Sequence, residues 1–277
     1  MTIEETTSPA ANGAYRAKKR ALSPDLRRTP YYLLSCLLLY GGWQLAVALT
    51  ASSARRFLIP APSAVAGKLV DLLRDGTLAR HAGITLTEMG LGLLVGTTVA
   101  LLLGYGVAHS RLIAYLLEPA IVISQAVPIV ALAPLLTVWF GSGLSSKVVV
   151  CALIVFFPIL VNVTTGLKSI DPGQRDLFRM LEASRWQTLV ALEVPSALPD
   201  FLSGLKVGGT LSAMGAVVGE FVASTQGLGY LVKQGQNLYD LPRMFAAILT
   251  LMAIATAVYA ILTLLERAAL RWPRSAS

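Results

Sequence analysis

The chain has 277 residues, of which 55% are hydrophobic and only 14% are charged. This composition, with several long runs free of charge, excludes an ordinary soluble domain and indicates a protein that crosses a membrane several times. The net charge of +8 does not indicate nucleic-acid binding, because the sequence has no basic stripe with interleaved aromatic residues. The Lys and Arg residues gather instead in tails and loops, as orientation signals do.

The predicted fold class is an all-α membrane protein with six transmembrane helices. Residues 1–30 are polar and basic and predict a cytoplasmic tail, which precedes a transmembrane domain over 31–272. The six spans are predicted at 31–50, 84–108, 119–140, 147–167, 201–223 and 244–265.

The segment between the first two spans is polar enough to leave the membrane. Its apolar residues recur on one side of a helix, which predicts a short amphipathic helix on the outer surface. These residues are Val65, Leu69, Leu72 and Leu73. The second span is rich in glycine, and small residues let helices approach closely in lipid. In the third span, Pro128 and Pro134 predict one kinked helix.

Six spans place both ends of the chain on one side of the membrane. The tail, the turn at 109–111, the region 168–206 and the C-terminus together hold 15 of the 23 Lys and Arg residues, and the opposite side holds 8. The positive-inside rule therefore predicts that both termini are cytoplasmic, with the polar region after the fourth span beside them.

That polar region, at 171–195, predicts a short helical hairpin. Asp171 and Pro172 suit the start of one helix, and Ser184 with Gln187 has the sequence of a capping box at the start of another. The second helix is expected to stop before Pro195, whose ring cannot continue it. An amphipathic hairpin is suited to docking into another protein, although an ordinary solvated loop has the same polar character.

Three features of the hairpin and the span after it occur together in a known family. They are Ala183-Ser184-Arg185-Trp186-Gln187, the pair Pro195 and Pro199, and Gly204-Leu205-Lys206. With them, this stretch resembles the cytoplasmic "EAA" loop of the permease subunits of ABC importers, nearest to the nitrate, sulfonate and taurine branch. The resemblance extends over nearly the whole chain beyond the tail.

The resemblance implies a type I importer permease fold, in which the hairpin forms the coupling helices that press into a groove on the ATPase subunit. The residues it assigns to coupling are Asp176, Leu177, Phe178, Arg179, Leu181, Glu182, Ala183, Ser184, Arg185 and Trp186. The chain departs from the family at Glu182, where glycine is usual, and at Asp176-Leu177-Phe178, where an acidic residue and two alanines are usual. Because glutamate adopts positive φ only at a cost, the turn geometry at Glu182 stays open.

Polar side chains at membrane depth are costly, so they point to a function or to a partner inside the bundle. Glu88, Gln125 and Glu220 are the candidates for the translocation path. Glu88 is also consistent with a hydrated carboxylate at the outer rim, and Glu220 with structural pairing across the bundle. Gln125 is also consistent with a residue that holds helices together.

The sequence offers no catalytic chemistry. It has no G-x-x-x-x-G-K-[ST] motif, so no cofactor is expected in this chain, and ATP and Mg are expected on the partner ATPase subunit. No metal-ligand spacing occurs, and Cys36 and Cys151 both fall in apolar runs, where a stabilising disulfide is not expected. The chain is therefore predicted to be a transport subunit and not an enzyme.

By the resemblance, the chain pairs with a second permease copy, as a homodimer, in the bilayer of a bacterial inner membrane. Two ATPase subunits and an external substrate-binding protein are the other partners. The solute is expected to be small and anionic or heterocyclic, such as a sulfonate, nitrate, bicarbonate or a vitamin precursor. A channel or secondary transporter that works without ATP is the alternative, although no inverted repeat with charged midplane residues is visible. A non-transporting scaffold or enzyme is the third possibility.

Overall fold

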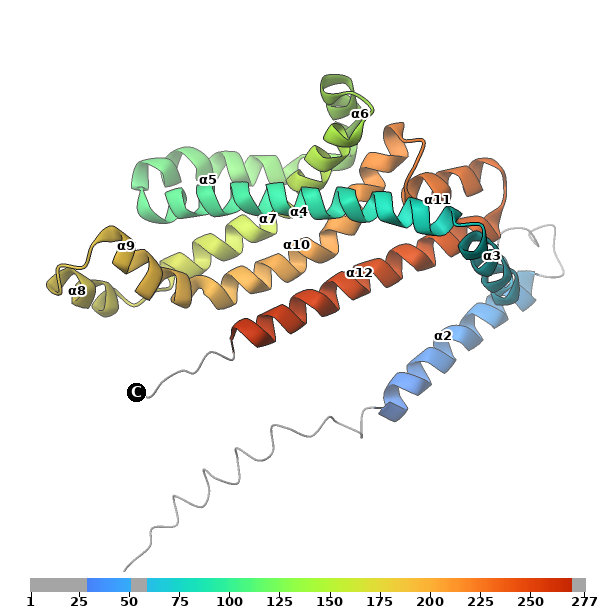
Figure 1. The fold of residues 1–277 in the computed structure, drawn as a ribbon, viewed down its shortest axis with the longest axis horizontal. Coiled ribbons are helices and arrows are strands. Elements are labelled where there is room, and N and C mark those ends of the chain that lie inside the picture. The colour runs from blue at the N-terminus through green and yellow to red at the C-terminus, as the bar shows by residue number, and fades with distance from the viewer. Residues whose placement is uncertain (1–28, 51–58, 271–277) are drawn as a thin grey trace, which may run out of the picture. The chain divides into compact units, whose positions relative to one another are not determined.

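The structure, a computed structural model, describes residues 29–50 and 59–270, and every regular element within these ranges is a helix (Figure 1). The chain divides into two units, Met1–Pro62 and Ser63–Ser277, which are described separately. The predicted basic tail lies outside the described residues apart from its last two, which begin the first helix.

The first unit contains α2, which spans Thr29–Thr50 and coincides with the first predicted span. Its 22 residues include no charged side chain, and this length is enough to cross the hydrocarbon core of a bilayer. The indole N–H of Trp43 donates a hydrogen bond to the carbonyl of Pro60 at 3.1 Å, which ties the helix to the segment that precedes the second unit.

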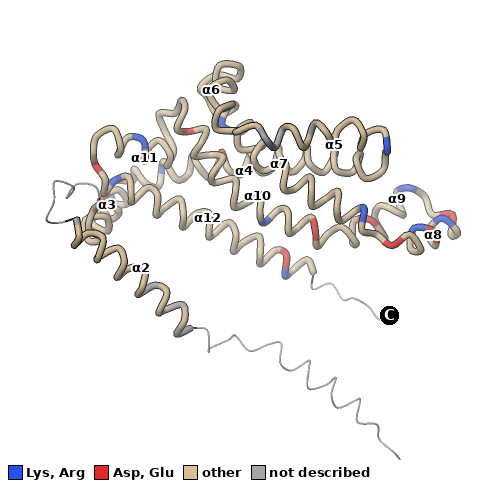
Figure 2. Tube along the Cα trace, turned by 180° about the vertical axis from the view of Figure 1, so that it is seen from behind, with Lys and Arg blue, Asp and Glu red and all other residues tan. Residues whose placement is uncertain are grey.

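The second unit is built on three long helices that pack side by side: α4 (Thr77–His109), α7 (Leu144–Lys168) and α10 (Val194–Ala223). A fourth long helix, α12 (Leu241–Ala269), packs against α10. The charged residues of the second unit gather toward the two ends of the bundle, and long central stretches of its helices carry none (Figure 2). This distribution is typical of a bundle whose middle lies in lipid.

Four helical stretches among the described residues are long and apolar enough to cross a membrane. They are Thr77–His109, Leu144–Lys168, Arg185–Val222 and Leu241–Ala269. The remaining two of the six predicted spans, at α2 and in the region after α4, stay predictions.

The third predicted span is not one kinked helix. It is divided into α5 (Arg111–Ala126), which doubles back along α4, and α6 (Ile129–Phe140), with Val127 and Pro128 non-helical between them (Figure 1). Proline has no N–H to donate and disfavours helical geometry in the residue before it, so Pro128 ends α5 outright. The 16 residues of α5 and the 12 of α6 are each short of the roughly 20 that a spanning helix needs.

Close contact between α4 and α7 depends on glycine, as the composition of the second span predicts. A Cβ atom built on Gly96 would lie 2.7 Å from the carbonyl oxygen of Ala152, whereas a Cβ on Gly90 of the same helix would meet nothing within 4 Å. The buried core then lies along α7, where Val155, Ile159 and Leu160 have almost no exposed surface. Small residues on one helix and branched residues on the other therefore set this packing.

Two shorter helices, α3 (Pro62–Arg74) and α11 (Leu228–Asn237), lie at the end of the bundle where α4 begins (Figure 1). The amphipathic helix predicted before the second span is α3, which buries Val65 and Leu72 while Leu73 is exposed. The ammonium of Lys68 lies 3.0 Å from a carboxylate oxygen of Asp240, which joins α3 to the start of α12.

At the opposite end, α8 (Pro172–Met180) and α9 (Arg185–Thr188) form the predicted hairpin, but the chain does not stop before Pro195. It continues from α9 through a π-helical turn, η2 (Leu189–Glu193), directly into α10. In this turn the N–H of Val194 donates to the carbonyl of Leu189, five residues earlier. The wider turn accommodates a proline at the start of α10, where its missing N–H is not needed.

Candidate functional site

The first leg of the hairpin begins with a side-chain cap, as the sequence predicts. The carboxylate of Asp171 accepts hydrogen bonds from the N–H groups of Gly173, at 2.6 Å, and Gln174, at 3.3 Å. Pro172 occupies the first helical position, where its missing N–H costs nothing. These local interactions fix where α8 starts without help from the bundle.

The turn after α8 settles the geometry at Glu182. The N–H of Glu182 donates to Arg179 and the N–H of Ala183 donates to Phe178, both at 3.0 Å, which is the hydrogen-bond pattern of a Schellman motif. Glu182 accordingly has φ of 51°. The glutamate therefore adopts the left-handed conformation that the family gives to glycine, at a cost of about 1 kcal/mol.

The second leg begins with the predicted capping box. The N–H of Ser184 donates to the side-chain oxygen of Gln187 at 2.7 Å, and the N–H of Gln187 donates back to the Ser184 hydroxyl at 3.3 Å. Both hydrogen bonds are local in sequence, so the short α9 is preformed. The hairpin thus presents a defined surface.

That surface, over α8, α9 and the turn between them, is strongly apolar. Four large apolar side chains are exposed: Leu177 by 53%, Met180 by 82%, Leu181 by 69% and Trp186 by 71%. Exposed apolar groups gathered on one projecting element mark a site of interaction with another molecule. Met180 was not among the predicted coupling residues, although its spacing of three residues from Leu177 places both on one helix face.

The other predicted coupling residues divide into two groups. Asp176 and Arg179 are exposed and pair with each other at 3.0 Å, and Glu182, Ser184 and Arg185 are also exposed. Phe178 and Ala183 are half-buried, and Phe178 packs against the buried core of the bundle. Phe178 therefore holds the hairpin to the bundle and does not belong to the exposed surface.

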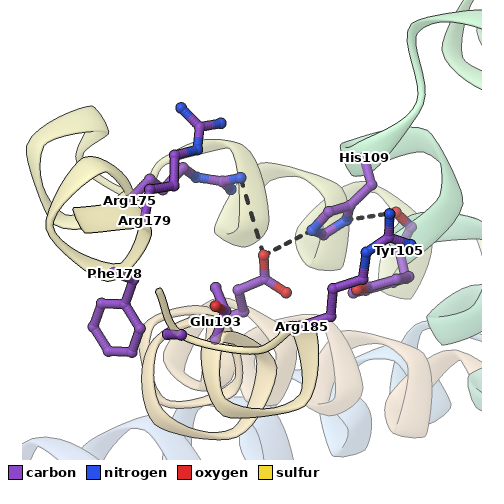
Figure 3. A pocket seen from close by; sticks show the side chains of 9 residues that line it. Tyr105, His109, Arg175, Phe178, Arg179, Arg185 and Glu193 are labelled. Carbon is purple, nitrogen blue, oxygen red and sulfur yellow. Dashed lines mark hydrogen bonds and ion pairs between the residues drawn. The ribbon is translucent and has the colours of Figure 1, made fainter. Parts of the chain in front are cut away.

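A pocket of about 580 Å³ lies between the hairpin and the last turn of α4 (Figure 3). Its lining includes Tyr105 and His109 from α4, Arg175 and Phe178 from α8, and Glu193 from η2. The Glu193 carboxylate lies 2.7 Å from a ring nitrogen of His109. The junction between hairpin and bundle is therefore polar and incompletely filled.

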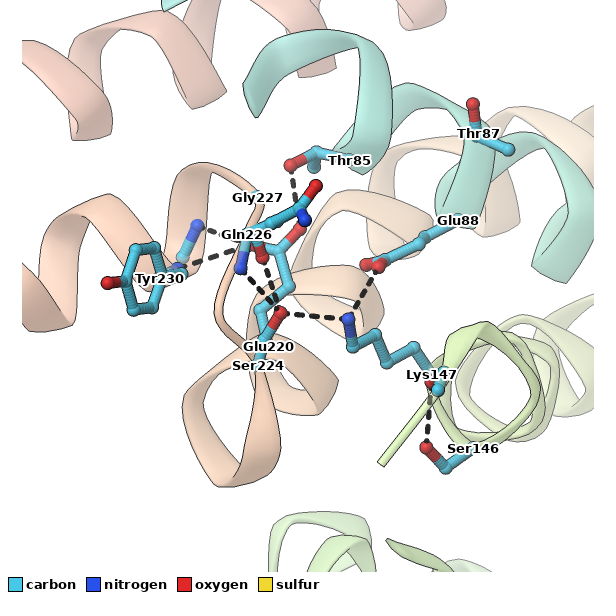
Figure 4. A network of polar contacts seen from close by, with 12 residues as sticks. Thr85, Thr87, Glu88, Ser146, Lys147, Glu220, Ser224, Gln226, Gly227 and Tyr230 are labelled. Carbon is cyan, nitrogen blue, oxygen red and sulfur yellow. Dashed lines mark hydrogen bonds and ion pairs between the residues drawn. The ribbon is translucent and has the colours of Figure 1, made fainter. Parts of the chain in front are cut away.

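At the other end of α4, two of the three predicted path residues are buried. Glu88 is 1% exposed and Glu220 is 0% exposed, so neither is a hydrated carboxylate at a rim. Lys147, from the start of α7, lies 3.2 Å from Glu88 and donates to the hydroxyl of Ser224 at 2.8 Å (Figure 4). Glu220 accepts a hydrogen bond from the hydroxyl of Thr85 at 2.6 Å.

We call these five residues, Thr85, Glu88, Lys147, Glu220 and Ser224, the buried polar network. Glu220 also accepts hydrogen bonds from the N–H groups of Gly229 and Tyr230, so it caps the first turn of α11. A carboxylate is favoured there by the exposed N–H groups and by the helix dipole. Gly227 has φ of 106° and leaves no space for a Cβ atom beside Glu220, which explains the glycine at that position.

Thr85, Lys147 and Ser224 were not predicted as members of a site, and Lys147 was counted only among the charges of the outer side. Glu88, Lys147 and Glu220 fall at the outer ends of the second, fourth and fifth predicted spans. An up-and-down arrangement of these spans places all three at the same end of the bundle, and that signal was present in the sequence. The third path candidate, Gln125, lies in α5, and its side chain is outside the described part of the chain.

Over residues 29–50 and 59–270, no group of three or more His, Cys, Asp and Glu side chains is placed to hold a metal ion. Apolar helices long enough to cross a bilayer and a projecting hairpin with exposed apolar side chains define a class: a membrane-embedded subunit with a surface for a partner protein.

The family is shown by sequence. Residues 93–271 match the family described as binding-protein-dependent transport system inner membrane component, and the chain belongs to it. Membership implies that an ATPase and a substrate-binding protein are its partners. The chain is the permease subunit of an ABC importer, as the resemblance of the hairpin predicted, and it is a component of an inner membrane.

Individual relatives agree with this assignment. The chain is 41% identical over 242 residues to the riboflavin transport system permease protein RibX of Chloroflexus aurantiacus, covering 87% of this chain and 90% of the relative. It is 34% identical to the formylaminopyrimidine transport permease protein ThiX of Halalkalibacterium halodurans, covering 78% of this chain and 86% of that protein. The taurine transport system permease protein TauC of Escherichia coli is 30% identical, with 77% and 80% covered. The chain thus lies in the nitrate, sulfonate and taurine branch.

Solved structures share the fold. A chain of the MetNI methionine ABC transporter, in an inward-facing conformation, has a TM-score of 0.64 and 20% identity, covering 70% of this chain and 97% of that chain. A chain of an amino acid ABC transporter crystallised with histidines has a TM-score of 0.56 and 19% identity, with 72% and 97% covered. The all-helical architecture is therefore that of type I importer permeases.

Proposed function

We propose that two copies of this chain form the translocation path for a small heterocyclic solute of the vitamin or vitamin-precursor class. The support is the order of the relatives: the riboflavin and formylaminopyrimidine permeases are 41% and 34% identical to this chain, and the taurine permease is 30% identical. Sulfonates, nitrate and bicarbonate are the competing solutes.

In this proposal the hairpin lies on the cytoplasmic side, together with both termini, and an ATPase subunit binds each of the two hairpins. The distribution of charge supports this orientation, since 15 of the 23 Lys and Arg residues fall on the side of the hairpin. ATP and Mg are bound by the ATPase, because this chain has no phosphate-binding loop motif.

The observation that carries the proposal is the exposed apolar surface of the hairpin, at Leu177, Met180, Leu181 and Trp186. A segment outside the membrane gains nothing by exposing four large apolar groups unless a partner covers them. ATP-driven closure of the ATPase dimer then moves the two hairpins, and the helix bundles attached to them rock to open the path on alternate sides.

The predicted path residues take a modified role in this proposal. The burial of Glu88 and Glu220 favours a place in the wall at the outer end of each permease, and not direct contact with the solute. A small pocket of about 210 Å³ has Glu88, Lys147 and Ser224 in its lining. Gln125, next to the break between α5 and α6, remains the candidate for solute contact.

The test is transport by the full complex of permease, ATPase and substrate-binding protein in proteoliposomes. We expect ATP-dependent uptake of radiolabelled riboflavin or of an aminopyrimidine, and little uptake of labelled taurine under the same conditions. Uptake of taurine alone would overturn the solute class while leaving the permease assignment intact. The molar mass of the detergent-solubilised permease, measured by light scattering, tests the homodimer.

A further inference from the structure

One buried carboxylate meets three separate elements at the base of the hairpin. Glu193 is the last residue of the π-helical turn, and its side chain is 5% exposed. Its Oε1 atom lies 2.7 Å from Nε2 of His109, the last residue of α4, and 4.0 Å from a guanidinium nitrogen of Arg175 on α8 (Figure 3). The Glu193 side chain therefore contacts both the hairpin, at Arg175, and the end of α4, at His109.

The position of His109 makes it a donor toward Glu193. Its Nδ1 lies 3.0 Å from the carbonyl oxygen of Tyr105, and its ring stacks on the Tyr105 ring with the centroids 4.0 Å apart. Both ring nitrogens thus face oxygen acceptors, and an N–H at Nε2 donates to the Glu193 carboxylate. His109 and Glu193 therefore form a charge-assisted hydrogen bond.

Arg175 extends the connection to a second long helix. Its guanidinium donates to the carbonyl of Leu167, in the last turn of α7, at 2.7 Å. Of the large apolar side chains of α8, only Phe178 packs on the core, while Leu177 and Met180 are exposed. The attachment of α8 to the bundle is therefore one aromatic ring and a set of polar contacts centred on Arg175 and Glu193.

The pocket beside these contacts shows that the hairpin is not held to the end of α4 by apolar packing. About 580 Å³ between the hairpin and the end of α4 is not filled by side chains, so apolar packing does not fix the hairpin there. Among the described residues, no buried side-chain atom that lacks a partner faces this pocket. The polar contacts among His109, Arg175 and Glu193 therefore hold the hairpin beside an open space.

We propose that His109, Arg175 and Glu193, which we call the Glu193 joint, make the hairpin move with α4 and α7, so that Glu193 is a positioning residue for transport. This proposal rests on the proposed function, in which the ATPase binds the hairpin. Without the joint, the ATPase still binds the exposed apolar surface, and the hairpin stays continuous with α10, but its displacement is taken up in the unfilled pocket and does not reach α4 and α7.

The test compares Glu193→Gln and His109→Gln in the complex of permease, ATPase and purified substrate-binding protein, reconstituted in nanodiscs. We expect the ATPase to co-purify with both variants as with the wild type. Stimulation of ATP hydrolysis by the binding protein is expected to fall about tenfold, the size of effect that one lost charge-assisted hydrogen bond gives. His109→Lys, which keeps a cation opposite Glu193, is expected to restore most of the stimulation.

The matched control is Glu266→Gln. Glu266 on α12 pairs with Lys206 on α10 at 2.7 Å. The variant therefore loses an ion pair of the same length that does not touch the hairpin. Normal stimulation in this variant and reduced stimulation in Glu193→Gln support the joint. A second readout is the distance between spin labels on Gln174→Cys and Leu102→Cys, whose distribution should broaden in Glu193→Gln and not in Glu266→Gln.

The outcomes separate the two proposals. If the wild-type permease does not retain the ATPase, the proposed function fails, whatever the joint does. If the ATPase is retained and stimulation is normal in both Glu193→Gln and His109→Gln, the joint is wrong and the docking surface stands. His109→Gln keeps the test decisive where Glu193→Gln lowers the yield of folded protein, because His109 is partly exposed and Arg175 remains opposite the Glu193 carboxylate.

Discussion

The two ends of α4 differ in which side chains are buried: apolar groups are exposed at one end, and charged groups are buried at the other. At the hairpin end, large apolar side chains such as Met180 and Trp186 lie in the open, although burying them would be favourable. At the other end, Glu88, Lys147 and Glu220 are almost fully buried, although burying a charge is costly unless it is paired. The first departure is the surface that the proposed function assigns to a partner, whereas the second is met largely within the subunit, where one carboxylate oxygen of Glu88 has no hydrogen-bond partner among the described residues.

The two ends also differ in how they are held. The hairpin is defined by contacts between residues two to five positions apart, from the Asp171 cap to the Ser184 capping box. The buried polar network joins residues 135 and 77 positions apart, as in the Thr85 to Glu220 and Lys147 to Ser224 hydrogen bonds. We therefore expect single charge changes in the buried polar network to lower the stability of the protein. Single charge changes in the hairpin should instead weaken binding of the partner.

The largest effect on stability should come from Lys147→Met. It leaves Glu88 as an unpaired carboxylate in a buried site, and breaking a buried pair in this way costs about 3–5 kcal/mol. Thermal unfolding of the purified permease in detergent measures the loss. The double variant Glu88→Gln with Lys147→Met removes both charges and should recover most of the stability. An equal loss in the single and double variants would show that the pair is not what holds this end.

The next effect is expected at the hairpin and in binding only. Leu181→Asp places a charge in the proposed apolar contact and should weaken binding of the ATPase about 100-fold, from the loss of about 2–3 kcal/mol of apolar burial. Trp186→Asp should act in the same way. Co-purification of the ATPase with the tagged permease measures the change.

The control for these hairpin variants is Gln174→Asp, which adds the same charge to an exposed polar position of α8. It should leave binding unchanged. Normal recovery of the ATPase with Leu181→Asp and Trp186→Asp would remove the distinction between the two ends of the molecule.

A smaller effect is expected between the two ends, where α4 contacts α7. Gly96→Ala introduces a Cβ 2.7 Å from the carbonyl oxygen of Ala152 and should cost about 1–3 kcal/mol. Gly90→Ala meets nothing within 4 Å and should be neutral or stabilising, because alanine is the better helix former. A direct comparison of the melting temperatures of the two variants tests whether close packing or helix propensity determines the stability at these positions.

The smallest effect should come from Glu182→Gly. Glycine adopts the positive φ of this turn without the penalty that glutamate has, so the hairpin should gain about 1 kcal/mol of local stability. Slower hydrogen exchange of the Ala183 N–H, which closes the turn, measures the gain. Glu182→Ala, which keeps the penalty, is the control and should exchange like the wild type.

The sequence was most informative where structure is local. The caps at Asp171 and Ser184 are confirmed, because a helix start depends on residues within one turn. The positions of α7 and α12 also follow from their uncharged runs. The family resemblance of the hairpin led to the permease assignment, which the relatives confirm.

The errors arose where several elements compete. Pro128 separates α5 from α6, while Pro195 is accommodated at the start of α10, although the same ring chemistry applies to both. The difference is the π-helical turn before Pro195, which no local rule predicts. Lys147 was counted only among the charges of the outer side, without the Glu88 carboxylate that α4 brings to it.

The uninterrupted helix from Arg185 to Val222 has a mechanical consequence. Its 38 residues form one continuous helix with a path length of about 57 Å, at 1.5 Å per residue, that begins in the hairpin and ends just after Glu220, which caps α11. A tilt of about 5° at the near end displaces the far end by about 5 Å, over such a length. In the proposed function, small angular movements of the hairpin are thereby converted into ångström-scale opening at the other end of the bundle.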